Sequence, residues 1–69
     1  MYQKEAYEAV EQAKQNTGEW FGDEEHDEQV CFANGVYTVA SNGDAQDYSN
    51  GDKAAEALMW QWQQEDRKS

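Results

Sequence analysis

The pair Asn-Gly occurs three times between residues 34 and 51, and it constrains the fold of this chain more than any other feature. Both residues tolerate the positive φ of a type I′ turn, so Asn-Gly between short β-prone runs is a strong signal of a tight hairpin. Turns at Asn34-Gly35 and Asn42-Gly43 would join three such runs within residues 29–49. The sequence therefore predicts a three-stranded antiparallel meander.

Two-residue turns also fix the register of the strands, with Ala33 opposite Val36 and Ser41 opposite Asp44. Side chains alternate between the two faces of a strand. One face then collects large apolar residues and one glutamine, namely Val30, Phe32, Tyr37, Val39, Gln46 and Tyr48. The other collects small and mixed residues, namely Cys31, Ala33, Val36, Thr38, Ala40, Ala45 and Asp47. We expect the first face to form the core and the second to face water.

Helical periodicity flanks the meander on both sides. Residues 2–15 gather one apolar stripe, formed by Tyr2, Ala6, Ala9, Val10 and Ala13, and Gly18 suits a C-terminal cap. Residues 49–52 resemble a capping box that opens a second helix over residues 52–66. Its stripe of Ala54, Ala55, Leu58, Met59 and Trp62 should lie on the sheet. Trp60 points nearly opposite, where it would wrap a sheet edge, pack on another aromatic ring or stand exposed as an interaction anchor.

Two short segments connect the first helix to the meander. Residues 19–22, Glu-Trp-Phe-Gly, are expected to form a core plug or a brief extended piece. Residues 23–28 hold five carboxylates around His26, and we expect them to form a solvated loop with His26 at the surface. The order predicts a single α+β domain over residues 1–69, αβββα, with both helices on one face of the sheet.

Acidic residues outnumber basic ones by 15 to 5, which gives a formal net charge of −10. This balance opposes nucleic acid or an anionic membrane as a direct partner and favours a basic protein surface. The negative charge is uneven, with a net of −7 over residues 1–28 and −3 over residues 29–69. The alternative is that acidity only keeps a small protein soluble.

The sequence offers no constellation typical of catalysis, and we expect neither an enzyme nor a cofactor. Cys31 is the only cysteine, has no basic neighbour to activate it, and cannot form an internal disulfide. Residues 23–28 lack the ligand spacing of an EF-hand or of a zinc site, so we expect no metal site. With no signal peptide and no apolar run long enough to span a membrane, a cytoplasmic location is expected.

In size, charge and element order, the chain resembles small acidic phage proteins that inhibit CRISPR systems, some of which act as DNA mimics. The features that carry this resemblance are the glutamates of the first helix, the acidic run of residues 23–28, and Trp60 and Trp62 in the last helix. The resemblance implies binding to a Cas subunit, with a type I surveillance complex as the candidate, and no catalysis. For a phage protein it also implies the host cytoplasm.

We expect the partner-binding residues to be spread rather than gathered in one pocket. They are Glu5, Glu8, Glu11, Glu19, Asp23, Glu24, Glu25, Asp27, Glu28 and Trp60. An alternative is a structural or adaptor module, monomeric or homodimeric, that uses Trp60 or the small sheet face around Cys31, Val36 and Ala40. A third hypothesis, an enzyme or metal-binding module, rests only on His26 and its acidic neighbours.

Overall fold

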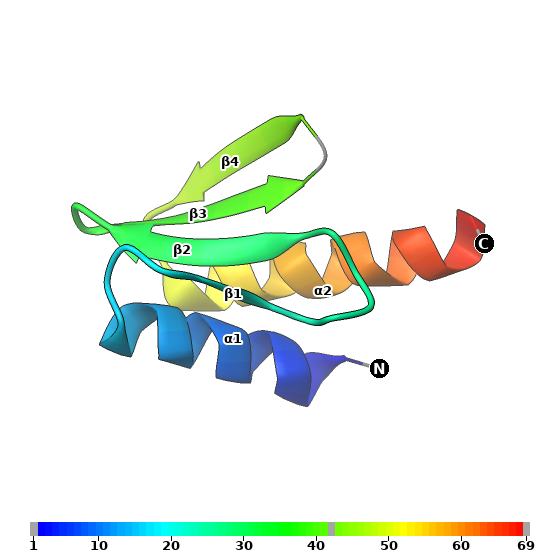
Figure 1. The fold of residues 1–69 in the computed structure, drawn as a ribbon, viewed down its shortest axis with the longest axis horizontal. Helices are drawn as coiled ribbons and strands as arrows, with labels where there is room; N and C mark the ends of the chain where they lie inside the picture. The colour runs from blue at the N-terminus through cyan, green and yellow to red at the C-terminus, as the bar shows by residue number, and fades with distance from the viewer. Residues whose placement is uncertain (1, 42, 69) are drawn as a thin grey trace.

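The computed structural model describes residues 2–41 and 43–68, and within them two helices pack on one face of a four-stranded antiparallel sheet (Figure 1). The elements are, in order, α1 (Gln3–Gln15), β1 (Trp20–Gly22), β2 (Gln29–Ala33), β3 (Val36–Ser41), β4 (Asp44–Tyr48) and α2 (Gly51–Lys68). The α+β class and the placement of both helices on one sheet face are confirmed.

The predicted turns and register are confirmed where the structure describes them. Ala33 pairs with Val36 and Ser41 pairs with Asp44. Asn34 and Gly35 both have positive φ, at 55° and 80°, as a type I′ turn requires. Gly43 has a φ of 89°, whereas its predicted turn partner Asn42 lies outside the described residues.

The prediction of three strands is wrong by one, because residues 20–22 form an additional edge strand. Trp20 pairs with Cys31 and Phe21 pairs with Val30, so β1 extends the meander to the order β1-β2-β3-β4. A three-residue strand is too short to show a period of two. β1 also pairs with β2 across the loop of residues 23–28, and the sequence does not show that this loop brings the two strands together.

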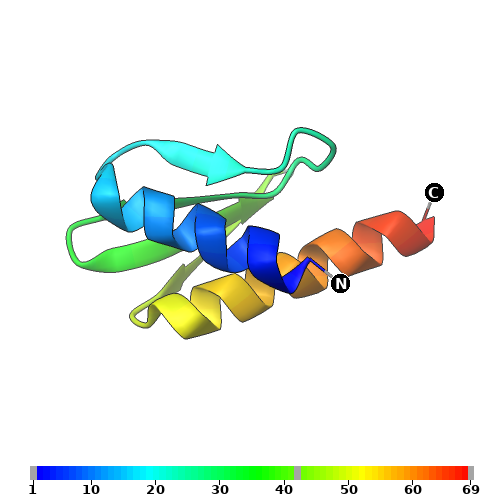
Figure 2. The same ribbon diagram turned by 90° about the horizontal axis from the view of Figure 1, so that it is seen from below.

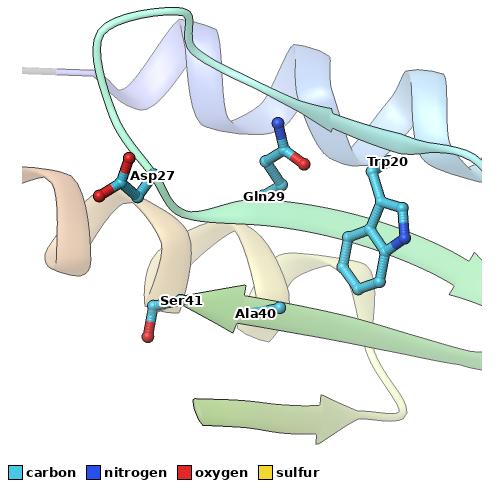
Figure 3. Close-up of a pocket in the computed structure, with 5 residues that line it drawn as sticks. All are labelled: Trp20, Asp27, Gln29, Ala40 and Ser41. Carbon is cyan, nitrogen blue, oxygen red and sulfur yellow. The ribbon is translucent and has the colours of Figure 1, made fainter. Parts of the chain in front are cut away.

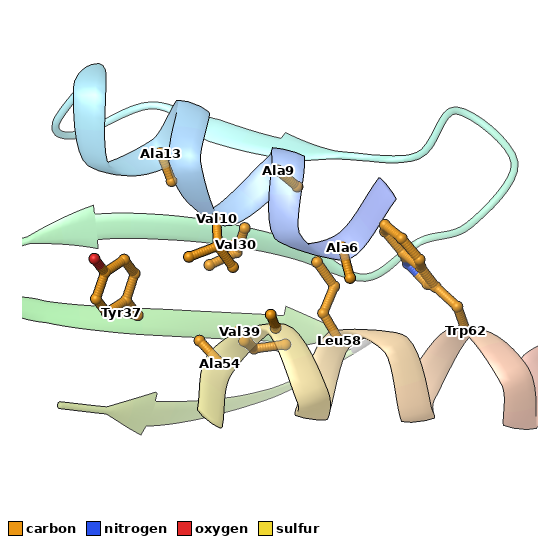
Figure 4. Close-up of a cluster of buried hydrophobic side chains, with 11 residues drawn as sticks. Ala6, Ala9, Val10, Ala13, Val30, Tyr37, Val39, Ala54, Leu58 and Trp62 are labelled. Atoms are coloured by element: carbon orange, nitrogen blue, oxygen red, sulfur yellow. The ribbon is translucent and has the colours of Figure 1, made fainter. Parts of the chain in front are cut away.

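The core lies between the helices and the sheet (Figure 4). Figure 2 shows α1 and α2 side by side, running in roughly opposite directions, with α1 packed on β1 and β2 and α2 packed on β3 and β4. The predicted core faces are largely confirmed by the buried apolar residues, which are Ala6, Ala9, Val10, Ala13, Val30, Tyr37, Val39, Ala54, Ala55, Leu58 and Trp62. The other apolar members, Tyr2, Phe32, Tyr48 and Met59, are half-buried against this core, whereas Gln46 on β4 is exposed, contrary to the prediction. The buried alanines are small enough for the two helices to approach closely. The larger buried side chains fill the space between the helices and the sheet.

Two helix ends differ from the expected caps. Asn50, rather than Ser49, caps α2, because its Oδ1 accepts hydrogen bonds from the backbone N–H groups of Asp52 at 2.7 Å and Lys53 at 3.4 Å. At the end of α1 the cap residue is Asn16, whose backbone N–H and side-chain amide both donate to the Gln12 carbonyl. Gly18 follows with a φ of 91° and donates its N–H to the Phe32 carbonyl, which turns the chain into β1.

Candidate acidic interaction surface

The exposed side of α1 carries a row of carboxylates. Glu5, Glu8 and Glu11 are all exposed, while the buried alanines and Val10 occupy the opposite side of the helix. Residues three apart on a helix are neighbours along its surface, about 4.5 Å apart along the axis. The row therefore presents closely spaced negative charges to solvent.

The loop of residues 23–28 carries a second set of exposed carboxylates. The Asp23 carboxylate accepts a hydrogen bond from the backbone N–H of Glu25 at 2.8 Å, and the Asp23 backbone carbonyl accepts one from the backbone N–H of His26 at 3.3 Å. The loop therefore begins with a tight turn. Glu24, Glu25 and Asp27 extend into solvent, as the sequence predicts.

The two acidic segments border one shallow hollow of about 260 Å³. Glu5, Glu8 and Gln12 of α1 line it on one side, and Gly22 and Asp23 line it on the other. Glu5, Glu8, Glu11, Glu24, Glu25 and Asp27 are called the acidic surface below. Glu19, which precedes β1, is also exposed.

His26 is not at the surface, contrary to the prediction. It is 6% exposed, and its ring stacks on Trp62 with centroids 5.5 Å apart. Its Nε2 lies 2.9 Å from Asp66 Oδ1 and its Nδ1 lies 3.2 Å from Asp23 Oδ2. The Tyr2 ring packs edge-on against both His26 and Trp62, and its hydroxyl donates to Asp66. The imidazole therefore joins the acidic loop to the two ends of the chain.

The surroundings of this cluster shift its titration. Burial lowers the pKa of His26, but the hydrogen bond to Asp66 and the close contact with the Asp23 carboxylate, together with their charges, outweigh burial and raise it above the ordinary value. The hydrogen bonds from Tyr2 and His26 lower the pKa of Asp66. The hydrogen bond to Asp66 is the main cause that raises the pKa of the Tyr2 hydroxyl to about 12. The arrangement thus favours a protonated imidazole between two carboxylates.

Glu28 is also buried, so the prediction that all of residues 23–28 lie in solvent is wrong for it. Its backbone carbonyl accepts the Trp62 indole N–H at 3.3 Å, which holds the end of the loop under α2. Burial, followed by a hydrogen bond to Glu65, raises the pKa of the Glu28 carboxyl. Glu28 and the half-buried Asp23 therefore anchor the acidic loop, whereas Glu24, Glu25 and Asp27 are free to meet a partner.

Two of the three tryptophans are exposed, and they lie on different elements. Trp60 on α2 is 59% exposed, which selects the last of its three predicted positions. Trp20 on β1 is 47% exposed and is the cross-strand partner of Cys31. Because such partners lie on the same face of a sheet, the indole stands beside the thiol. Cys31 is accordingly buried, which corrects the prediction that it faces water.

A second concavity, of about 320 Å³, lies on the sheet face opposite the helices (Figure 3). It is lined by Trp20, Asp27, Gln29, Ala40 and Ser41, and we call it the Trp20 groove. Figure 3 shows Trp20 at one end and Asp27 with Ser41 at the other. Sequence reasoning missed this groove because its walls meet only once β1 pairs with β2.

The search for a metal centre extends beyond the two concavities to the whole described part of the chain. Across residues 2–41 and 43–68, no group of three or more His, Cys, Asp or Glu side chains is placed to hold a metal ion. In the same part of the chain, neither helix has an apolar stretch of the length needed to cross a bilayer. In comparisons with protein-family models, curated proteins and solved structures, nothing matches this chain.

Proposed function

We propose that this chain is a non-enzymatic inhibitor that binds the basic, nucleic-acid-binding surface of a protein. Its carboxylates would take the places of phosphates toward Arg and Lys side chains. The observation that carries the proposal is that the α1 row and the acidic loop border one hollow. Glu5 and Glu8 of α1 and Asp23 of the loop thereby bring carboxylates from two separate segments to one hollow, and Glu24 and Glu25 follow Asp23 in the chain.

The density of charge supports this reading. The chain is 34 Å long and carries a net charge of −10. Duplex DNA of that length carries roughly 20 phosphate charges, of which about half face any one side. The whole chain therefore carries about as much net negative charge as one side of the duplex it would displace, and the six carboxylates of the acidic surface supply part of it. Direct binding to nucleic acid is disfavoured by the same charge.

The resemblance to acidic anti-CRISPR proteins supplies a candidate partner, a Cas subunit of a type I surveillance complex. The matching experiment is co-purification of the tagged chain from a host that expresses such a complex, followed by elution across a salt series. A phosphate-mimicking contact should weaken steeply as salt rises, because it depends on many screened charges. Capture that is insensitive to salt would reject the proposal.

A second candidate function is a structural or adaptor module, favoured by the exposure of Trp60. Exposed tryptophans are frequent anchors of protein interfaces. A homodimer formed through Trp60 should dissociate on dilution in sedimentation experiments, and Trp60→Ala should abolish it. The acidic-surface substitutions described below should leave such a dimer intact.

A further inference from the structure

We propose that the Trp20 groove is the receptor for one arginine side chain of the partner protein, a proposal that rests on the proposed function and adds a specific contact to it. The groove has an apolar end, formed by the exposed indole, and a polar end, formed by Asp27 and Ser41, with Gln29 between them. Arginine has the same division, with a methylene stem and a planar cationic head.

The charges around the groove favour a cation as the occupant. Asp27 supplies a carboxylate within the lining, and no basic residue is among the described residues that line it. Asp27 belongs to the acidic loop, so the negative field of Glu24 and Glu25 lies close by in the chain. An anion or a nucleotide phosphate would be repelled here, whereas a guanidinium would be attracted.

The shape of the groove favours a side chain over a free small molecule. Its volume of about 320 Å³ is at the small end of ligand pockets, and its mouth is open on the sheet face. The indole can stack on the stem or the guanidinium plane, and Asp27, Gln29 and Ser41 offer oxygen acceptors for its five donors. Lysine has only three donors around a point charge, so arginine should bind better.

The test uses N-acetyl-arginine amide as the probe and records two-dimensional ¹⁵N NMR spectra of the intact chain. The indole N–H of Trp20 and the side-chain amide of Gln29 should shift with saturation. Under the same conditions, N-acetyl-lysine amide should produce smaller shifts. The Trp60 indole serves as an internal control, since it is exposed but lies outside the groove. Equal shifts at Trp20 and Trp60, or equal responses to both probes, would overturn the proposal.

Matched substitutions localise the contact. Trp20→Ala should weaken arginine binding roughly two- to fivefold, as expected for a cation on an exposed indole, whereas Trp60→Ala should not change it. Asp27→Asn should weaken it by a similar factor, whereas Glu24→Gln, with the same charge change in the same loop, should have a smaller effect. Because Asp27 and Glu24 are both exposed, these two variants should fold normally, and equal effects from them would reject a groove contact.

The outcome can be separated from that of the proposed function. With a partner complex in hand, Trp20→Ala should reduce affinity without changing the dependence of affinity on salt. Loss of carboxylates from the acidic surface should reduce both. A Trp20→Ala variant that competes as well as the unaltered chain would remove the groove and leave the acidic mimic standing. Concentration-dependent self-association that Trp20→Ala abolishes would instead assign the groove to a second copy of the chain.

Discussion

Replacing Trp62 with alanine should remove most of the stability of this domain. Its side chain is 1% exposed and fills the space between α2, His26 and Tyr2. Truncating a buried tryptophan costs about 3–5 kcal/mol in lost transfer energy and cavity formation. The loss should lie toward the upper end here, because the Glu28 carbonyl also loses its donor.

That cost is large for a chain of 69 residues. At typical values per residue, a domain of this length has a free energy of unfolding of roughly 3–10 kcal/mol. The Trp62→Ala variant should therefore be largely unfolded or strongly shifted to lower urea midpoints. Far-UV circular dichroism is the suitable probe, because the substitution also removes a fluorophore.

Trp60→Ala is the matched control, since it deletes the same side chain two residues away on the exposed side of α2. Its free energy of unfolding should stay within about 0.5 kcal/mol of the unaltered chain. A Trp62→Ala variant as stable as Trp60→Ala would show that the helix does not pack on the sheet as described.

Three further predictions concern the cluster around His26, the buried Glu28 and the turns at Gly35 and Gly43. Because the pKa of His26 is raised in the folded chain, the stability that the protonated imidazole contributes is complete below the unfolded pKa and is lost as pH rises through the folded pKa. The His26→Gln substitution should therefore make the urea midpoint depend less on pH between pH 6 and 9. The raised pKa of Glu28 means that ionisation of its carboxyl opposes folding as pH rises above the ordinary carboxyl pKa. The Glu28→Gln substitution should therefore raise the thermal midpoint at pH 7, and a lower midpoint would contradict this prediction. Gly35 has a φ of 80°, so Gly35→Val should lower stability by about 1–2 kcal/mol, whereas Gly35→Asn should cost much less. Gly43→Val should behave like Gly35→Val, and unchanged melting of both valine variants would argue against the turns.

Local signals predict the meander well because the Asn-Gly pairs favour the positive φ that its tight turns require. Asn34-Gly35 sets both the turn and the register, and the alternation of residues 29–48 then assigns the core face. The helices follow from periodicity in the same way. These elements depend on residues that are close together in the sequence.

The buried members of the acidic loop could not be predicted because their partners are distant in the chain. His26 meets Asp66 across 40 positions, and the Glu28 carbonyl meets Trp62 across 34. A histidine among carboxylates looks solvated until α2 places the Asp66 carboxylate and the Trp62 indole around it. For residues 19–22 the predicted alternative of a brief extended piece agrees with β1, but its place in the sheet could not be predicted, since pairing with β2 rather than its own pattern defines the strand.

Location-specific charge reversal tests the central claim most directly. The measurement is competition with labelled duplex DNA for the partner complex, using three variants with identical net charge. Glu5→Lys with Glu8→Lys alters the α1 row, and Glu24→Lys with Glu25→Lys alters the loop. Asp44→Lys with Glu56→Lys changes exposed carboxylates on β4 and α2 instead.

Circular dichroism should show all three variants folded, because the substituted side chains are exposed. A phosphate-mimicking surface predicts that the first two variants lose most of their competition and that the third retains it. Equal loss in all three variants would mean that only net charge matters. Full competition by both acidic-surface variants would contradict charge mimicry and leave the surface around Trp60 as the better candidate.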